Sequence, residues 1–323
     1  MGKCGVDMKT AIGGYFELEL QQSEHFHKNA MKLNTARNCL EYILRANKYQ
    51  KIYIPYYTCE VILEPIKKYN IQCEFYHINI DLEPEIEREL KKNEAFLYIN
   101  YFGLKQNTVE RLAKLYTKQL IVDNSQAFYA EQIKGIDTFY SARKFFGVSD
   151  GAYLYTNRLL DKDLEQDISY ERMSHLLKRI DFGAEFGYND FKHNDNLLIN
   201  QPIKKMSKLT DKILKSIDYD NAKQQRIKNY KLLNGHLQKN NQIKISLNEN
   251  AVPMVYPYLP NSKKMRNKLI QKNIFVATYW NNVLEWSKQG SIECELTEKL
   301  LPLPIDQRYN EDNIIKIINL IKK

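Results

Sequence analysis

The chain has 323 residues, 43% of them hydrophobic, which is enough for a sizeable core in one large domain or two moderate ones. Its net charge is +9, but the lysines are spread along the whole sequence and do not form stripes with aromatic residues, so we expect no nucleic-acid partner. No apolar run approaches the roughly 20 residues that a membrane span needs, so we also expect no membrane insertion.

The N-terminal residues and the cysteines favour a cytoplasmic location. The first ten residues, MGKCGVDMKT, lack the apolar core of a secretory signal, and Val6 stands where a myristoylation motif has Ser or Thr. The cysteines form no CxxC motif, which predicts reduced thiols. His25 and His27 lie two positions apart but belong to no HExxH motif, so we expect no bound metal.

Strand and helix patterns alternate in the first half of the chain. Apolar side chains recur on one face of residues 35–49, which predicts a helix capped by Asn34 or Thr35. Residues 51–81 then read as strand, helix and strand, with Pro55 closing the first strand. The remaining patterns are strands within 94–103, 118–126 and 151–157 and a helix over 108–118. This alternation predicts an α/β domain with a largely parallel sheet flanked by helices.

The second half has a different texture. Residues 165–240 are polar and mostly helical, residues 251–260 and 273–280 have strand-like patterns, and residues 310–323 form an amphipathic closing helix. We therefore predict a large domain over residues 1–215 and a smaller α+β domain over residues 216–323.

Two residues with chemical potential fall at neighbouring strand ends. Asp123 follows the apolar run QLIV, where a carboxylate is costly to bury without a partner, and Lys144 follows the segment FYSA. Ligands of α/β sheets bind beyond the carboxyl ends of the strands, so this carboxylate and this amine can face each other across a flat cofactor.

Pyridoxal 5′-phosphate (PLP) requires such a pair of groups, a lysine for its aldehyde and an acid for its pyridine nitrogen. The carboxylate keeps the nitrogen protonated, so that the ring accepts the electrons released when a substrate proton leaves. The lysine binds the aldehyde and later moves the proton, and both tasks require the neutral amine that burial near other cations favours.

The segment 121–157, IVDNSQAFYAEQIKGIDTFYSARKFFGVSDGAYLYTN, resembles the DegT family of nucleotide-sugar aminotransferases, which are fold type I PLP enzymes. Other segments are similar to family motifs and follow in the family's order from about residue 10 to 320: IPYYTCEVILEPIKKYNIQCEFYHIN (54–79), INYFGL (99–104), FGYNDF (186–191) and LLPLPIDQRYNEDNIIKII (300–318). The resemblance implies the fold type I architecture, a large domain with a mostly parallel mixed sheet and a smaller α+β C-terminal domain.

The resemblance also implies roles for individual residues. Lys144 becomes the lysine that binds PLP covalently, Asp123 the partner of the pyridine nitrogen, and Gln126 the neighbour of the 3-hydroxyl group. Ser141 would donate its hydroxyl to the phosphate, and Asn189 would reach the phosphate of a neighbouring subunit. The expected assembly is therefore a homodimer with shared active sites.

Three positions depart from the family pattern. Ala36 and Arg37 replace a Gly and a Thr of the phosphate-binding helix start, and Arg37 is our candidate for compensating by binding the phosphate directly. Cys59 occupies the place of the aromatic residue that stacks on the pyridine ring, for which Tyr57 or Tyr56 could substitute. The arginine after the Gly-Tyr-Asn motif is absent, since Phe191 and Lys192 stand there.

The resemblance predicts a PLP-dependent aminotransferase that moves an amino group, from glutamate, to a keto group of a nucleotide-linked deoxysugar. Some family members that carry histidine in place of Lys144 dehydrate sugars, so the lysine favours transamination. Candidate substrate contacts are Tyr15, Phe16, Lys192, His193, Tyr279 and Trp280. The alternatives are an aminotransferase for a substrate without a nucleotide and a catalytically silent binding or regulatory protein.

Overall fold

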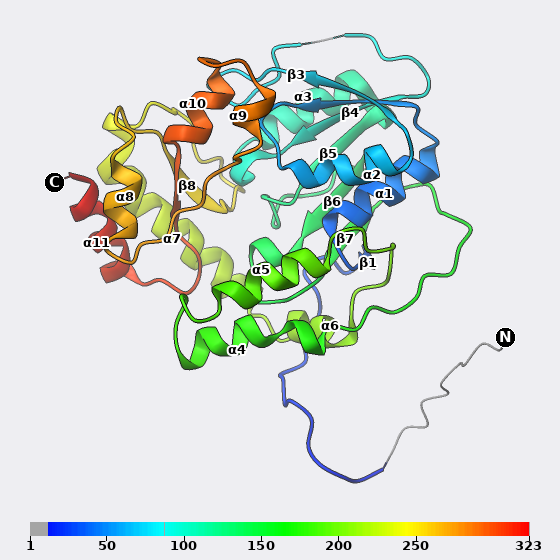
Figure 1. Cartoon of the computed structure of the whole chain (residues 1–323), viewed down its shortest axis with the longest axis horizontal. Helices are drawn as coiled ribbons and strands as arrows, with labels where there is room; N and C mark the ends of the chain where they lie inside the picture. The colour runs from blue at the N-terminus through cyan, green and yellow to red at the C-terminus, as the bar shows by residue number, and fades with distance from the viewer. Residues whose placement is uncertain (1–11, 87, 323) are drawn as a thin grey trace.

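The computed structural model describes residues 12–86 and 88–322 (Figure 1). The N-terminal ten residues, on which the expectation of no targeting signal depends, lie outside this part. The strands are β1 Met31–Leu33, β2 Lys51–Pro55, β3 Gln72–Tyr76, β4 Glu94–Ile99, β5 Leu120–Asn124, β6 Asp137–Ser141, β7 Ala152–Tyr155, β8 Val255–Tyr258 and β9 Leu301–Pro304. The α-helices are α1 Ala36–Asn47, α2 Leu63–Lys68, α3 Gln106–Tyr116, α4 Ser174–Asp181, α5 Tyr188–Leu197, α6 Lys208–Lys215, α7 Tyr219–Leu237, α8 Met265–Ile270, α9 Val283–Trp286, α10 Ile292–Lys299 and α11 Glu311–Lys322.

A seven-stranded sheet in the order β1-β7-β6-β5-β4-β2-β3 forms the centre of the fold. Strands β2 to β6 pair in parallel, whereas β7 is antiparallel to β6 and β1 is antiparallel to β7. The strands of its middle are almost entirely buried, as expected for parallel strands covered on both faces. This confirms the predicted α/β fold with a mostly parallel sheet flanked by helices.

Helix α1 forms where the periodic apolar pattern predicts it. The Thr35 side chain caps the helix by accepting a hydrogen bond from the backbone N–H of Asn38 at 3.1 Å. The helix ends at Lys48, whose left-handed φ of 57° closes the last turn. Cys39 and Ile43 are fully buried on the face that packs on the sheet.

The elements after residue 215 gather beside the sheet, where α7 to α11 surround a second, two-stranded sheet of β8 and β9 (Figure 1). In this antiparallel pair Pro257 faces Pro302. Proline has no backbone N–H, so the two prolines suit a position of the ladder where facing residues exchange no hydrogen bonds. The whole second sheet lies within the predicted small domain, while the boundary at residue 215 stays a prediction.

The prediction of a strand over residues 273–280 is wrong, since this segment is irregular in the structure. Ile274 and Val276 are buried with the alternation that suggested a strand. The guanidinium of Arg266 donates hydrogen bonds to the carbonyls of Val276, at 3.3 Å, and Ala277, at 2.5 Å. A side chain therefore satisfies backbone groups that a neighbouring strand would otherwise pair, and β8 takes the Leu-Pro segment β9 as its partner.

Across residues 12–86 and 88–322, no helix combines the length and the apolar character required to cross a bilayer. In the same part of the chain, no three His, Cys, Asp or Glu side chains gather as metal ligands would. His25 and His27 are buried beside β7, where the His25 ring lies 2.7 Å from the Tyr153 hydroxyl and the His27 ring 2.7 Å from the Phe128 carbonyl oxygen.

Candidate active site

A cavity of about 350 Å³ lies at the carboxyl ends of β4, β5 and β6, and its size is typical of a small-molecule site. Strand ends, the start of α1, residues 58–62 and part of α5 form its walls. The predicted site residues that line it are Ala36, Arg37, Cys59, Asp123, Gln126, Ser141, Lys144 and Trp280.

Asp123 is a half-buried carboxylate that lines this cavity. It is the next-to-last residue of β5, where the register places it beside Phe139 of β6. Burial raises the pKa of Asp123, while the backbone N–H of Ser125, which donates to its Oδ1 at 2.8 Å, and the charge of Lys144 act in the opposite direction. The Ser125 side chain also donates toward this carboxylate, so all the donors that Asp123 has among the described residues come from Ser125, and none is a cation at hydrogen-bonding distance.

Lys144 ends a single 3-10 turn, Ala142–Lys144, that directly follows β6. The two residues after it, Phe145 and Phe146, are buried and anchor the turn in the core. The side chain of Lys144 is exposed and makes no hydrogen bond or ion pair to any residue within 12–86 and 88–322. Parallel neighbouring strands therefore bring the amine and the Asp123 carboxylate to one cavity, as we predicted from the sequence.

The amide of Gln126 is oriented by the backbone. Its Oε1 accepts a hydrogen bond from the N–H of Phe102 at 2.9 Å, which leaves the Nε2 group to donate into the cavity. Phe102 and Gly103 both have left-handed backbones, with φ of 57° and 73°. At Gly103 a Cβ would lie 2.9 Å from the carbonyl oxygen of Val252, so this turn requires glycine.

The start of α1 supplies free backbone donors at the cavity wall. Thr35 accepts from Asn38, so the N–H groups of Ala36 and Arg37 are left without intrahelical acceptors, and no acidic side chain lies in this first turn. The hydroxyl of Ser141, at the end of β6, lines the same cavity and has no hydrogen-bond partner in the part of the chain that the structure describes. Such a helix start attracts an anion.

Arg37 does not reach free into the cavity. Its Nη1 donates to Glu64 at 2.6 Å, and both side chains are largely buried. The second oxygen of Glu64 accepts from the backbone N–H of Asn200 at 2.8 Å. The guanidinium is therefore held by a carboxylate, and a phosphate would have to share it with Glu64.

No tyrosine takes the place of the aromatic residue that, in the family, stacks on the pyridine ring. Cys59 lines the cavity, whereas Tyr57 is fully buried behind it, with its ring 5.1 Å from that of Trp280. Tyr56 stacks on the far side, against Phe75 at 4.9 Å. Among the described residues that line the cavity, Trp280 and Phe139 carry the only aromatic rings.

The predicted site residues outside this cavity are Tyr15, Phe16, Tyr57, Asn189, Lys192, His193 and Tyr279. Tyr15 and Phe16 are exposed on an extended segment beyond α6 (Figure 1). Asn189, Lys192 and His193 are exposed on α5. Tyr279 is half-buried, with its ring centroid 6.1 Å from that of Phe102. A single chain therefore does not bring these side chains to Lys144.

Several cavity residues were missed by the sequence analysis. Arg143 lines the cavity beside Lys144 and forms an ion pair with Asp195 of α5, and Phe139 forms the wall next to Asp123. The position of Arg143 next to Lys144 was the available signal, because a residue adjacent to a site lysine has a high chance of sharing its cavity. The contribution of Asp195, which is distant in sequence, had no such signal.

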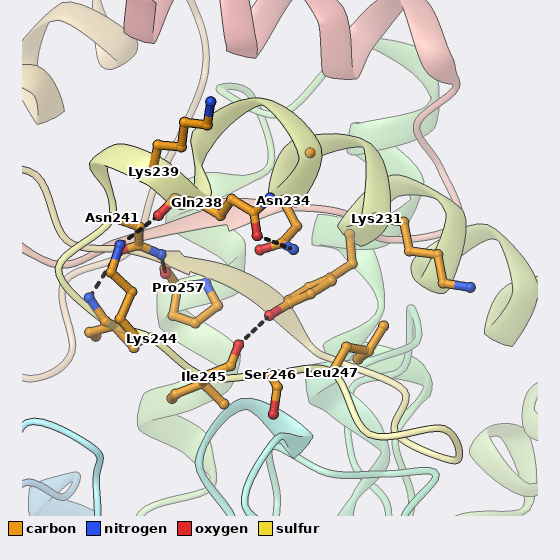
Figure 2. Close-up of a pocket in the computed structure, with 13 residues that line it drawn as sticks. Lys231, Asn234, Gln238, Lys239, Asn241, Lys244, Ile245, Ser246, Leu247 and Pro257 are labelled. Carbon is orange, nitrogen blue, oxygen red and sulfur yellow. Dashed lines mark hydrogen bonds between the residues drawn. The ribbon is translucent and has the colours of Figure 1, made fainter.

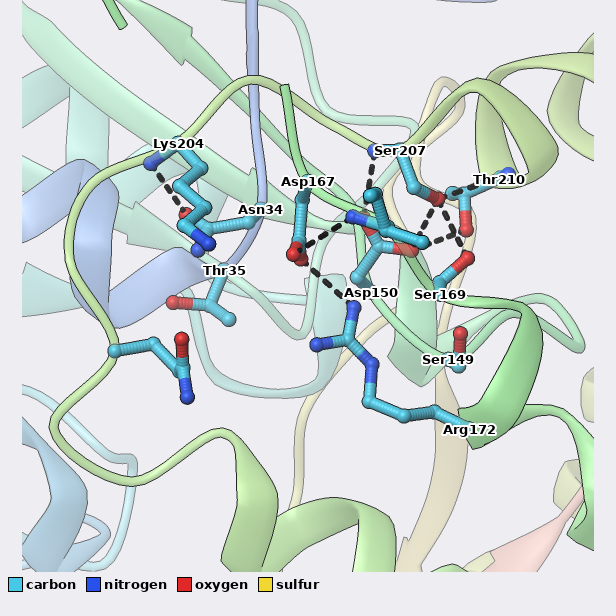
Figure 3. Close-up of polar contacts among 12 residues, drawn as sticks. Asn34, Thr35, Ser149, Asp150, Asp167, Ser169, Arg172, Lys204, Ser207 and Thr210 are labelled. Atoms are coloured by element: carbon cyan, nitrogen blue, oxygen red, sulfur yellow. Dashed lines mark hydrogen bonds and ion pairs between the residues drawn. The ribbon is translucent and has the colours of Figure 1, made fainter. Parts of the chain in front are cut away.

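A buried carboxylate fixes the turn between the lysine segment and β7 (Figure 3). Asp150 accepts hydrogen bonds at 2.8 Å from both the backbone N–H and the hydroxyl of Ser207, and another from the Thr210 hydroxyl, although burial still raises its pKa. Gly151 follows with a φ of 109° and donates its N–H to the Asn34 carbonyl at 2.6 Å. The turn therefore ties the lysine segment to Asn34, which directly precedes Thr35, the cap of α1.

Two further cavities lie elsewhere. One of about 680 Å³ shares Arg143 and Lys144 with the first and extends along α4 and α5 to residues 306–308. Another, of about 670 Å³, lies between α7 and residues 241–247 (Figure 2) and contains none of the predicted site residues. Of its lysines, Lys231 and Lys239 point away from one another (Figure 2), and Lys244 donates to the carbonyl of Gln238 at 2.7 Å.

No protein-family model and no curated protein matches the chain, but many solved structures do. A DegT DnrJ EryC1 StrS aminotransferase from Brucella abortus is 14% identical, with 91% of this chain and 85% of that chain covered and a TM-score of 0.61. DesV from S. venezuelae, in complex with a ketimine intermediate, is 14% identical, with coverages of 93% and 85% and a TM-score of 0.62. A mutant of the GDP-4-keto-6-deoxymannose-3-dehydratase ColD, with bound GDP-perosamine, is 12% identical, with coverages of 90% and 88% and a TM-score of 0.62. Over at least 90% of its length, the chain thus has the fold of the DegT-type aminotransferases and of ColD, as the sequence resemblance predicts.

Proposed function

We propose that this protein is a PLP-dependent aminotransferase that transfers an amino group, from glutamate, to a keto group of a nucleotide-linked deoxysugar. The observation that carries the proposal is the composition of one cavity. A half-buried carboxylate, a lysine amine, an oriented amide and the free start of a helix all line it. Each of these groups matches a different part of the PLP molecule.

The residues present fit this cofactor. Asp123 lacks a cationic partner at hydrogen-bonding distance, and a protonated pyridine nitrogen would supply one. The N–H groups of Ala36 and Arg37 and the Ser141 hydroxyl would hold the phosphate at the start of α1. Gln126 Nε2 would donate to the 3-hydroxyl oxygen, and Lys144 Nζ would bind the aldehyde carbon.

When bound, PLP supplies an electron sink for the pair of electrons left behind by a departing substrate proton. The task of Asp123 is to hold a proton on the pyridine nitrogen, which makes that sink effective. Lys144 Nζ, as the neutral amine, would take the proton from the substrate carbon and deliver it to the cofactor carbon that carried the aldehyde. Phe139 and Trp280 would supply the apolar wall against which the flat ring of the cofactor lies.

The substrate class is supported by the cavity that adjoins Lys144. Arg143, Arg179 and Arg308 line it together with Tyr188 and Phe191, so cations and aromatic rings lie side by side. Such a wall suits a nucleoside diphosphate, whose charges would meet the arginines and whose base would meet the rings. ColD, which has this fold, was solved with GDP-perosamine. The choice of glutamate as donor stays a prediction. The resemblance assigns recognition of the donor's carboxylate to an arginine after the Gly-Tyr-Asn motif, and this chain has no arginine there.

A homodimer would complete the site. Helices α4 and α5 and the residues between and after them expose an apolar surface, of which Ile180 is 81%, Phe186 68% and Phe182 64% exposed. We name it the α4–α5 apolar surface, formed by Leu177, Ile180, Phe182, Phe186, Tyr188, Phe191, Leu197 and Ile199. Asn189 is exposed within it, in position to reach a second copy. Contiguous exposed apolar surfaces of this kind mark association sites.

Two alternatives remain open, and the cytoplasmic location stays a prediction. A catalytically silent binding protein is favoured by the altered helix start, where Arg37 is engaged by Glu64, and by Cys59 at the stacking position. An aminotransferase for a substrate without a nucleotide would need the same cavity but would have no use for the arginine-lined cavity beside it.

Cofactor loading tests the proposal. The purified protein is incubated with PLP, reduced with borohydride and digested, and the peptides are analysed by mass spectrometry. We expect the cofactor mass on Lys144, its loss in Lys144→Ala, and its retention in the control Lys134→Ala, which removes an exposed lysine outside the cavity. Loaded protein should then convert glutamate to 2-oxoglutarate in a single turnover.

The outcomes separate the alternatives. A protein that retains no PLP refutes the cofactor and favours the silent binding protein. Retained PLP without a reaction toward glutamate refutes the donor only. Equal turnover of free and nucleotide-linked keto sugars refutes the nucleotide requirement.

A further inference from the structure

Arg226 is a buried cation that lies outside the cavity of Asp123 and lines the adjoining arginine-lined cavity, where the proposed function gives it no role. It lies on α7 and is 1% exposed. Burial lowers its pKa to about 10, and none of its hydrogen-bond acceptors is a carboxylate. Removing a guanidinium from water is costly, so its retention needs a reason beyond filling space.

The guanidinium acts on the residue directly after Lys144. Its Nη2 donates to the carbonyl of Phe145 at 3.3 Å, and its plane lies over the Phe145 ring at 4.5 Å. Its Nε donates to the Oε1 of Gln307 at 3.1 Å, and the Nε2 of Gln307 donates to the same Phe145 carbonyl at 3.0 Å. Two donors from the C-terminal third of the chain thus converge on the Phe145 carbonyl oxygen, one residue after Lys144.

A third bond of Arg226 leads to the opposite wall of the cavity. Its Nη1 donates to the carbonyl of Met254 at 2.9 Å. The N–H of Met254 donates to the carbonyl of Phe102 at 2.8 Å, and the N–H of Phe102 donates to the Oε1 of Gln126 at 2.9 Å. A continuous series of hydrogen bonds therefore runs from Phe145 through Arg226 to Gln126.

We propose that Arg226 is a positioning residue, which fixes Lys144 relative to Gln126 by joining both sides of the cavity through one planar guanidinium. This inference rests on the proposed function, because the distance between Lys144 and Gln126 is the one that PLP would span. Arginine suits the task, since three of its N–H groups meet three acceptors in fixed directions, whereas a lysine ammonium on a flexible stem cannot.

A matched control lies on the same helix. Asn229 is as buried as Arg226, and its amide donates to the carbonyls of Ile305, at 3.1 Å, and Tyr309, at 2.9 Å. It therefore braces the C-terminal segment that carries Gln307, but among the described residues it makes no hydrogen bond to the lysine segment itself. A variant that harms only the packing of α7 should resemble Asn229→Ala.

The test compares Arg226→Met, Arg226→Lys, Gln307→Met and Asn229→Ala at temperatures where circular dichroism shows each folded. We expect the Kd for PLP to rise at least tenfold in both Arg226 variants. It should rise about threefold in Gln307→Met, because Arg226 keeps its bond to the Phe145 carbonyl, and less than threefold in Asn229→Ala. In a Lys144→Ala background the effect of Arg226→Met should fall below threefold, because no amine remains to be misplaced.

A second measurement requires no cofactor. The pH dependence of Lys144 acetylation by acetic anhydride, read by mass spectrometry in the cofactor-free protein, should change in Arg226→Met and stay unchanged in Asn229→Ala. Equal effects of the two variants, or a tenfold loss that persists without Lys144, would overturn the positioning role. If the wild-type protein bound no PLP, the proposed function would fail, and the acetylation profile would still decide the role of Arg226.

Discussion

Replacing Asp123 by Asn removes a charge from the cavity while keeping the shape of the side chain. One carboxylate oxygen already accepts the Ser125 N–H at 2.8 Å, so an asparagine oxygen can keep that bond. What the variant loses is the negative charge that would face the pyridine nitrogen. The change therefore isolates the electrostatic task of Asp123 from its local hydrogen bonding.

The size of the effect follows from the proximity of opposite charges. A carboxylate at contact distance raises the pKa of a cationic acid by about 1–3 units, which corresponds to about 1.4–4 kcal/mol. If this energy is expressed in the proton-transfer step, the single-turnover rate with glutamate should fall by about 10- to 1000-fold. Covalent capture of PLP on Lys144 should persist, since the amine is untouched.

The assay is stopped-flow absorbance of the loaded protein mixed with glutamate. Ser125→Ala serves for comparison, because it keeps the charge and the backbone donor and removes only the side-chain hydrogen bond to Asp123, so its effect should be smaller. A rate within twofold of the wild type, in a variant that still captures PLP on Lys144, would refute the pairing of Asp123 with the pyridine nitrogen. A complete loss of PLP capture would also contradict it, because it would assign Asp123 to binding and not to charge.

The remaining predictions concern stability and assembly. Burial raises the pKa of Asp123, so the folded state binds this proton more tightly than the unfolded state, and the free energy of unfolding of the cofactor-free protein should fall as pH rises from about 4 through the folded pKa. Urea titrations across that range should show a shallower decline in Asp123→Asn, and an unchanged slope would contradict the burial effect. Gly151→Ala should lose about 1–3 kcal/mol of stability in the same titrations, because its φ is 109° and the new Cβ would lie 2.9 Å from Thr210 Cγ2. Adding Thr210→Ser removes that methyl group, so it should recover the part of the loss due to the close contact but not the part due to the backbone conformation. Phe182→Asp with Phe186→Asp should halve the mass measured by light scattering, whereas Leu115→Asp, at an exposed position of α3, should not. A monomeric wild type would refute the dimer.

The sequence predicts the parts of this protein that depend on local patterns and on general sheet geometry. The periodicity and cap of α1 were sufficient because both signals lie within one short segment. Asp123 and Lys144 meet at one cavity because the ends of parallel neighbouring strands share an edge, whatever the details of the loops.

The errors come from contacts that no local pattern reveals. Residues 273–280 alternate like a strand, but a distant arginine, Arg266, occupies their carbonyls. Tyr57 and Cys59 are two positions apart in an irregular segment, where no period indicates which side chain faces the cavity. Arg37 was predicted to bind the phosphate directly, but its guanidinium is held by Glu64, which belongs to another helix.

The bonds that converge on Phe145 also bear on how the chain acquires its structure during synthesis. They join residues 81 and 162 positions apart, so their donors leave the ribosome long after the lysine itself. A nascent chain that ends before Gln307 would contain the residues of the seven-stranded sheet but not the second donor to the Phe145 carbonyl. The bonds that hold the lysine segment would therefore form late, after the residues of the sheet have been synthesised.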